Sequence, residues 1–119
     1  MKDIAAKKEA ERLLNSINEN TTFDIKLEKD KDKRFVHEYN ITYDEVEWIV
    51  NNLPINQFRS KIKCEDLRYN NVDYLYDFKS FYSCVDIYGL DTAIPIYVKI
   101  GKDNLTNNTI VVVSLHEDE

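Results

Sequence analysis

A chain of 119 residues has the size of one domain, over residues 1–119, and is too short for two that each bury a core. Apolar residues make up 43%, and 8 Tyr, 5 Phe and 1 Trp are among them, so wholesale disorder is excluded. With 2 Gly the chain lacks the glycine-rich loops that cradle phosphates, so we expect no nucleotide cofactor. The net charge of −6 opposes long-range attraction of a polyanion, and any site for RNA must therefore be local.

The cellular location is predicted from what the apolar segments lack. No apolar run approaches the roughly 20 residues that span a bilayer, and the N-terminal stretch lacks the apolar segment of a secretory signal. We therefore expect a cytoplasmic protein that makes no membrane contact. Cys64 and Cys84 should be thiols in that reducing compartment, and with His37 and His116 they match no zinc spacing, so no metal site is predicted.

Two helices are predicted in the first half of the chain. Apolar residues at intervals of three and four indicate a helix over 3–19. A second is predicted over 43–53, because Thr42 and Glu45 have the spacing of a capping box. Between them, the charged run 29–34 mixes both signs, and we interpret it as a solvated turn or helix start in preference to an RNA patch. The residues expected on the buried side of the second helix are Tyr43, Val46, Ile49, Val50 and Leu53.

The second half of the chain is typical of strands. Alternating or Val-rich apolar segments predict strands over 23–28, 80–88, 94–100 and 109–116. We interpret 59–63 as a basic turn and 69–79 as a loop. Helices followed by closely spaced strands indicate an α+β fold, a small antiparallel sheet with the N-terminal helices packed on one face. The residues expected in the core are Ile96, Val98, Val111 and Val113.

Aromatic residues are concentrated between 69 and 88, with Tyr and Phe at Tyr69, Tyr74, Tyr76, Phe78, Phe81, Tyr82 and Tyr88. Such rings stack on unpaired bases in proteins that bind single-stranded RNA. Aromatic residues of a small domain more often belong to the core, and we favour that interpretation for the stretch as a whole.

Four polar residues on the last two predicted strands have the chemistry for RNA cleavage without a metal. That reaction requires groups that deprotonate a ribose 2′-hydroxyl, stabilise the phosphorane and protonate the leaving 5′-oxygen. Ser114 and His116 share one face of their strand by alternation, as do Tyr97 and Lys99. If the two faces coincide, the four form a polar patch. Each has an alternative role as an ordinary exposed strand residue.

The order of several segments resembles a known family. The segments are Ile41-Thr42-Tyr43-Asp44-Glu45-Val46, Leu53, Gln57-Phe58-Arg59-Ser60-Lys61, Val85-Asp86-Ile87-Tyr88, Ile96-Tyr97-Val98-Lys99-Ile100 and Val111-Val112-Val113-Ser114-Leu115-His116-Glu117. Together they cover roughly 35–117 and resemble MqsR-family toxins of bacterial toxin-antitoxin systems. The resemblance implies a RelE-like α+β fold, a metal-independent endoribonuclease that cleaves messenger RNA, and a protein antitoxin that neutralises it.

The family's functional positions carry over residue by residue. Its catalytic strand tyrosine is matched by Tyr97, the basic residue after the helix by Lys61 or Arg59, and a last-strand lysine by His116. The family's Trp-Gln pair has no counterpart around Cys84-Val85.

The sequence thus predicts His116, Tyr97 and Lys61 as catalytic residues, and it predicts Arg59, Lys63 and Lys99 as residues that bind the substrate. The partners we expect are single-stranded mRNA and a cognate antitoxin. The alternative hypothesis is a non-catalytic acidic protein on the same fold that sequesters a basic, nucleic-acid-binding partner. Cations gathered around His116 would favour cleavage, whereas a continuous acidic face there would favour the alternative.

Overall fold

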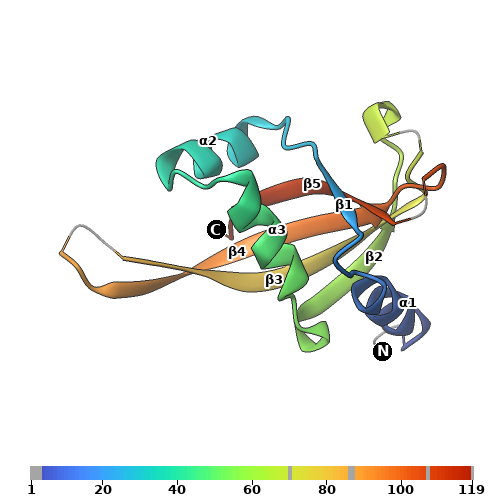
Figure 1. Ribbon diagram of the computed structural model, residues 1–119, viewed down its shortest axis with the longest axis horizontal. Helices are drawn as coiled ribbons and strands as arrows, with labels where there is room; N and C mark the ends of the chain where they lie inside the picture. Colours follow the sequence, from blue (N-terminus) through green and yellow to red (C-terminus); the bar gives the residue numbers. More distant parts are fainter. Residues whose placement is uncertain (1–3, 70, 86–87, 107, 119) are drawn as a thin grey trace.

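A computed structural model describes residues 4–69, 71–85, 88–106 and 108–118. These residues form three α-helices and five strands, with two short 3-10 turns (Figure 1). In chain order the elements are α1 (Ile4–Asn15), β1 (Thr22–Ile25), α2 (Asp30–Glu38), α3 (Tyr43–Asn51), η1 (Ile55–Gln57), β2 (Phe58–Lys63), η2 (Leu67–Tyr69), β3 (Tyr74–Val85), β4 (Asp91–Lys102) and β5 (Thr109–Glu117). No helix among the described residues is both long enough and apolar enough to cross a membrane.

The five strands form one sheet in the order β1-β5-β4-β3-β2. The α+β class predicted from the sequence is confirmed, but the wholly antiparallel sheet is wrong, because β1 pairs with β5 in parallel. A short connection forces two strands to pair antiparallel, as it does for β3 and β4, which follow each other closely in the chain. Residues 26–108 lie between β1 and β5, so the relative direction of these two strands is free of that constraint.

The helices cover one face of the sheet, which we call the helix face (Figure 1). Apolar residues from all three helices pack there against alternate residues of β3, β4 and β5. Thr42 caps α3 as predicted, since its Oγ1 accepts a hydrogen bond from the Glu45 backbone N–H at 3.2 Å. The predicted burial of Tyr43 is wrong, because this residue begins the helix and is 70% exposed. The core contacts of α3 come instead from Val46, Ile49 and Val50.

Two elements differ from the sequence prediction in kind. The predicted basic turn at 59–63 is β2, and the predicted loop at 69–79 contains the start of β3 at Tyr74. β2 is an edge strand, held by backbone pairing to β3, and edge strands need no regular apolar alternation. The first helix ends at Asn15 instead of 19, and the predicted helix start at residue 3 lies outside the described residues.

A β-bulge in β5 decides which way its last residues point. Ile100 pairs with Val112 and Lys99 pairs with Ser114, so Val113 is the extra residue. The bulge turns Leu115 into the core beside Val98, where both are fully buried. Ser114 and His116 consequently lie on the face opposite the helices. Without the bulge, simple alternation would place both on the helix face.

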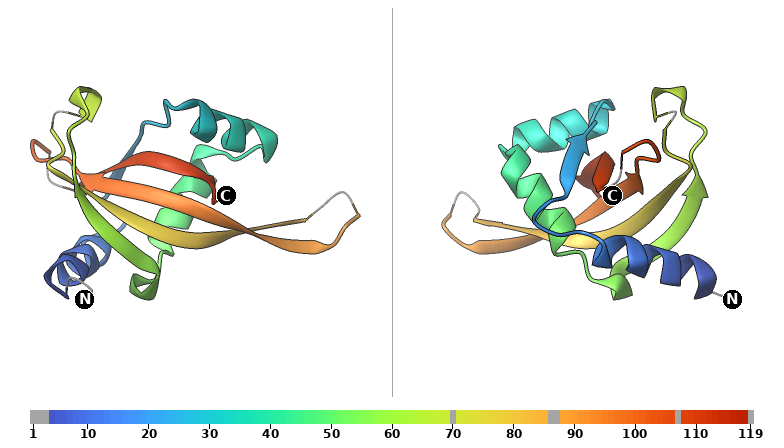
Figure 2. Two further views of the ribbon diagram at one scale, coloured as in Figure 1. Left: turned by 180° about the vertical axis from the view of Figure 1, so that it is seen from behind. Right: turned by 45° about the vertical axis from the view of Figure 1, so that its right-hand side comes forward.

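The predicted core residues are buried, but on two faces. Ile96 and Val98 belong to the large core under the helices. Val111 and Val113 belong to a small cluster on the opposite face, where the segment around η2 covers one end of the sheet. The rest of this opposite face carries no helix (Figure 2, left).

The strands β3 and β4 are longer than their neighbours and project as a two-stranded arm (Figure 1). The pairing of β2 with β3 ends at Phe78, and the pairing of β5 with β4 ends at Ile96. Residues 80–85 and 91–95 therefore pair with each other, and their one backbone hydrogen bond to β5 and its continuation among the described residues runs from the Asp118 N–H to the Pro95 oxygen at 2.9 Å. We call them the arm. On the side opposite the helices, the surface of the arm continues the surface of the sheet.

Replacement of a central core residue tests this packing. Val98→Ala should lower the free energy of unfolding by about 1 to 3 kcal/mol, through lost burial and the cavity left behind. Val98 is fully buried, whereas Val85 on the arm is 64% exposed and provides a matched Val→Ala control. Denaturant unfolding should separate the two variants clearly, and equal stability of Val98→Ala and wild type would contradict the core assignment.

Candidate functional site

Polar side chains occupy the middle of the sheet on the side away from the helices. We call this set the polar face, and its members are Ser60, Asp77, Lys79, Tyr97, Lys99, Ser114 and His116. The strand register arranges most of them in two rows across β3, β4 and β5. Lys79 pairs with Tyr97 and Tyr97 with His116, while in the next row Asp77 pairs with Lys99 and Lys99 with Ser114.

Asp77 is the buried centre of the polar face, with 1% of its surface exposed. Its Oδ2 accepts hydrogen bonds from the Tyr97 hydroxyl at 2.7 Å and from the Ser60 hydroxyl at 3.0 Å. Its Oδ1 lies 3.8 Å from Lys99 Nζ and accepts no hydrogen bond from the described residues. Burying a carboxylate is costly unless it is paired. Asp77 of β3 therefore holds side chains of its two neighbouring strands, β2 and β4, in fixed positions.

The environment of Tyr97 favours its protonated form. Burial and the hydrogen bond to Asp77 raise the pKa of Tyr97 to about 12, and the charge of Arg59 opposes the rise. A tyrosine of ordinary pKa, about 10, is already neutral near pH 7, and the rise holds the proton more tightly, so Tyr97 is a neutral but weak proton donor.

His116 lies flat against Tyr97. The two ring centroids are 5.6 Å apart, and the ring planes differ by 7°. His116 Nδ1 lies 2.9 Å from the backbone oxygen of Glu117. Because a carbonyl oxygen can only accept, Nδ1 carries the proton in this contact, and Nε2 is the nitrogen that can take up another. Two groups capable of proton transfer thus stand side by side.

A second buried carboxylate supports the outer side of β5. Asp32, from α2, is fully buried, and its Oδ1 accepts a hydrogen bond from the Leu115 backbone N–H at 3.0 Å. Its Oδ2 makes no hydrogen bond to the described residues. Burial raises the pKa of Asp32, while the neighbouring charges of Lys29 and Lys99 act in the opposite direction. The charged run 29–34 does start a helix as predicted, but the sequence pattern does not reveal that one of its members is buried.

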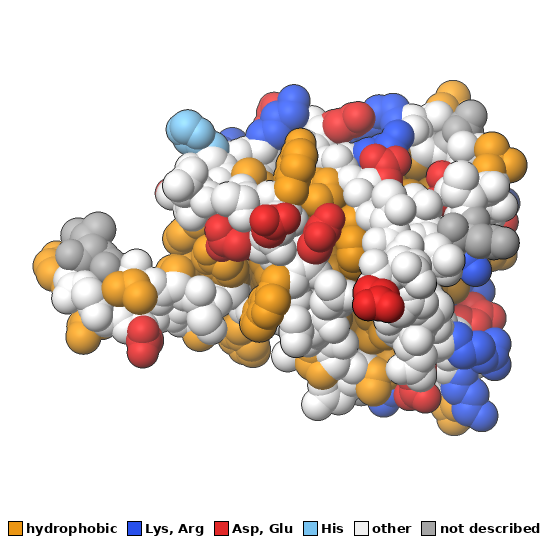
Figure 3. All heavy atoms as spheres, in the orientation of Figure 1, with side chains coloured by type: hydrophobic (Ala, Val, Ile, Leu, Met, Phe, Trp, Pro, Cys, Tyr) orange, Lys and Arg blue, Asp and Glu red, His pale blue; other side chains and the backbone are white. Residues whose placement is uncertain are grey.

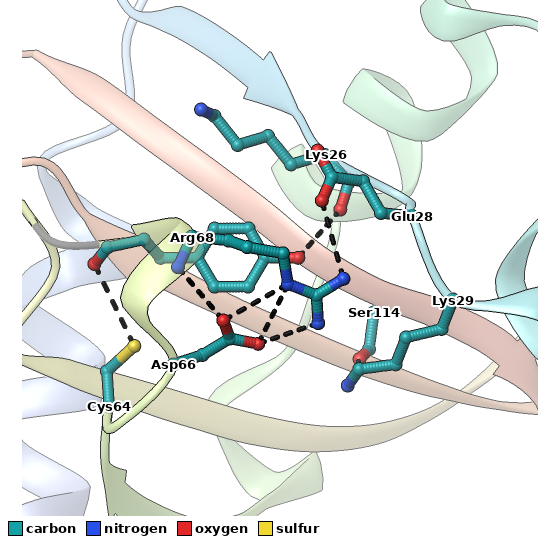
Figure 4. A network of polar contacts seen from close by, with 8 residues as sticks. Lys26, Glu28, Lys29, Cys64, Asp66, Arg68 and Ser114 are labelled. Atoms are coloured by element: carbon teal, nitrogen blue, oxygen red, sulfur yellow. Dashed lines mark hydrogen bonds and ion pairs between the residues drawn. The ribbon is translucent and has the colours of Figure 1, made fainter.

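Lys29 adds a positive charge to the edge of the polar face. Its Nζ donates a hydrogen bond to Ser114 Oγ at 3.2 Å. Exposed ion pairs join the segment before α2 to the segment of η2 (Figure 4). Arg68 Nη2 lies 2.7 Å from Asp66 Oδ2, and Arg68 Nη1 lies 3.5 Å from Glu28 Oε2. The hydrogen bonds from Arg68 lower the pKa of Asp66 to about 2.

Two predicted site residues lie on the other side of the sheet. Lys61 pairs with Tyr76 and forms an ion pair with Glu9 of α1, so its ammonium group is on the helix face. Lys63 follows by alternation and pairs with Tyr74. The structure therefore does not bring Lys61 or Lys63 together with Tyr97 and His116.

Arg59 differs from these two lysines because a bulge separates Phe58 from Ser60 in the pairing of β2 with β3. Arg59 lies at the bulge and is exposed. It is close enough to Tyr97 for its positive charge to oppose the rise in the pKa of the Tyr97 hydroxyl. Of the predicted set, the structure brings together Tyr97, Lys99 and His116, with Arg59 beside them. The sequence prediction missed Asp77 and Asp32, because alternation patterns treat a charged residue as exposed.

Among the described residues, no three His, Cys, Asp or Glu side chains gather as metal ligands would. No protein-family model, curated protein or solved structure matches this chain. The side chains of the polar face are therefore the basis for the functional proposal.

The buried carboxylate of Asp32 gives a prediction about pH. A carboxyl whose pKa is raised on folding stabilises the protein below its ordinary pKa, near 3.8, and that stabilisation is lost as pH rises through the raised value. Asp32→Asn removes this dependence and keeps an oxygen for the Leu115 N–H. Relative to Asp32→Asn, wild type should therefore lose stability from about pH 4 upward.

The measurement is denaturant unfolding of both proteins at several pH values, with the exposed Asp30→Asn as the control on the same helix. A stability difference between wild type and Asp32→Asn that is the same at every pH would contradict the raised pKa.

Proposed function

We propose that the polar face is the active site of a metal-independent endoribonuclease that cleaves single-stranded mRNA in the cytoplasm, and that the protein is the toxin of a toxin-antitoxin pair. The observation that supports this most is the stacked pair of Tyr97 and His116 above the buried Asp77. Histidine and a neutral tyrosine on one open surface supply a base and an acid for a single phosphodiester.

The proposed reaction uses each group once. His116 Nε2 removes the proton of the ribose 2′-hydroxyl, and the 2′-oxygen forms a bond to phosphorus while the bond to the 5′-oxygen breaks. The Tyr97 hydroxyl gives its proton to the leaving 5′-oxygen. The products are a 2′,3′-cyclic phosphate and a 5′-hydroxyl, and transfer of the proton from His116 to Tyr97 restores the starting state.

The charge that develops on the phosphorane requires nearby cations. Lys99 stands in the row next to Tyr97, and Lys29 and Arg59 flank the polar face from either side. These residues provide local positive charge on a chain whose net charge is −6. In this proposal Lys99 and Arg59 take the role that the sequence prediction gave to Lys61.

Such an enzyme must be inhibited in the cell that makes it, so the proposal includes a cognate antitoxin protein. An acidic toxin favours an antitoxin with a basic segment. Expression of the chain alone should arrest bacterial growth, and co-expression of the antitoxin should relieve the arrest.

The second candidate function is a non-catalytic protein whose acidic surface sequesters a basic partner. The observation that favours it is on the helix face, where acidic side chains gather around α3 (Figure 3). Asp44, Glu45 and Glu47 are exposed or half-buried on that helix. A purified chain that binds a basic protein through these residues and leaves RNA intact would favour this candidate.

The central test of the proposal is loss of the histidine. His116→Ala should reduce cleavage of single-stranded RNA in EDTA by about 10²- to 10⁴-fold, the usual contribution of a positioned acid or base. His37→Ala is the matched control, because His37 is exposed at the end of α2. Cleavage that survives in His116→Ala, or that requires added metal, would contradict the proposed chemistry.

Variants at two lysines, Lys99 and Lys61, test which face of the sheet acts on RNA. Lys99→Ala should slow cleavage by roughly 10- to 100-fold, since a hydrogen bond to a charged group contributes about 1.5 to 3 kcal/mol. Lys99→Arg keeps the positive charge beside Asp77 and should retain most activity. Lys61→Ala, on the helix face, should leave the rate unchanged. The reverse order of effects would place the active site on the other side of the sheet.

A further inference from the structure

Phe81 is an aromatic residue of the arm that the core does not use. It is 59% exposed, whereas Phe78 and Tyr82, the aromatic residues on either side of it in the chain, are fully or partly buried on the helix face. Phe78 is fully buried, and the hydroxyls of Tyr76 and Tyr82 donate hydrogen bonds to Glu9 and Glu45. The stretch is therefore core only in part. Tyr76, Phe78 and Tyr82 contribute to the core under the helices and Tyr69 to the cluster on the opposite face, whereas Tyr74, Phe81 and Tyr88 are exposed.

The strand register places Phe81 on the same side of the sheet as the polar face. Phe81 pairs with Pro95, one row beyond the row of Lys79 and Tyr97. Two residues of strand separate the rows, which is about 7 Å along the sheet. Phe81 is thus a diagonal neighbour of Tyr97 across the sheet, and His116 is one strand further away. No helix of the described residues covers this side of the sheet (Figure 2, left).

The side chains beside Phe81 include a cation that can contact a phosphate. Lys79, the member of the polar face next to Phe81 on the same side of β3, has 42% of its side chain exposed, and it forms an ion pair with Asp118 at 3.1 Å with which a phosphate must compete. An exposed ring beside a cation is the arrangement that binds single-stranded nucleic acid, in which bases stack on aromatic faces and phosphates contact the cations. The acidic residues of α3 lie on the helix face, away from this surface.

We propose that Phe81 is a stacking platform for the base of a nucleotide next to the scissile phosphate, and that single-stranded RNA runs from the polar face onto the arm. This inference rests on the proposed function, because it takes the polar face as the place where the phosphate binds. Stacking is tolerant of sequence, since every base has a flat face. Phe81 therefore contributes affinity for unpaired RNA and not a choice of base.

The test is binding of a fluorescent, fully 2′-O-methylated RNA oligonucleotide, which cannot be cleaved because it lacks the attacking 2′-hydroxyl. Phe81→Ala should weaken binding, measured by fluorescence anisotropy, by roughly 5- to 150-fold, the range found for loss of one base–aromatic stack. Phe81→Trp should bind as tightly as wild type or more tightly. Tyr43→Ala is the control, since Tyr43 is an exposed aromatic residue of α3, on the other side of the sheet.

The outcomes separate this inference from the proposed function. Wild type that binds the methylated oligonucleotide through Phe81 but leaves ordinary RNA intact supports the platform and overturns the cleavage proposal. Equal affinity of wild type and a folded Phe81→Ala variant overturns the platform, even if cleavage is observed. A Phe81→Ala variant that binds RNA normally but loses its antitoxin overturns the platform as well, and assigns the residue to a protein interface.

Discussion

The alternation of side chains along β4 decides which residues of this protein can act together. Ile94, Ile96, Val98 and Ile100 face the helices and bury the core, so Tyr97 and Lys99 must face the other way. The bulge at Val113 then brings His116 to the side of Tyr97 while Leu115 enters the core. The fold thus uses one face of the sheet for stability and presents chemical groups on the other.

The polar face includes a buried carboxylate, which lowers stability compared with an apolar side chain at the same position. A buried Asp77 must be desolvated, and its neighbours Ser60, Tyr97 and Lys99 compensate for that with two hydrogen bonds and a close charge. An apolar residue at this position would avoid the cost. In return, the hydrogen bond to Asp77 fixes the position of the Tyr97 hydroxyl, which is the acid of the proposed reaction. In the proposed function, Lys29, Arg59 and Lys99 supply local positive charge on a chain whose net charge is −6.

The parts of the fold that the sequence predicted are those with strong periodicity. Alternation identifies β4, and the capping box identifies the start of α3. The edge strand β2 was missed because backbone pairing to β3 holds it in place. Its sequence, Phe58-Arg59-Ser60-Lys61-Ile62-Lys63, does not alternate regularly between apolar and polar residues. Within the site, Tyr97, Lys99 and His116 were predictable from their chemistry. The position of Lys61 was not, since a one-residue bulge upstream changes the face of every following side chain.

The polar face can be located as a binding surface without reference to catalysis. The most direct measurement is a ¹H–¹⁵N NMR titration of the ¹⁵N-labelled protein with a 2′-O-methylated single-stranded RNA. The perturbed amides should cluster at 77–81, 95–99 and 114–118, where β3, β4 and β5 pass beneath Tyr97 and His116. Perturbations centred on Lys61, α1 or α3, or none at all, would show that RNA does not bind this face.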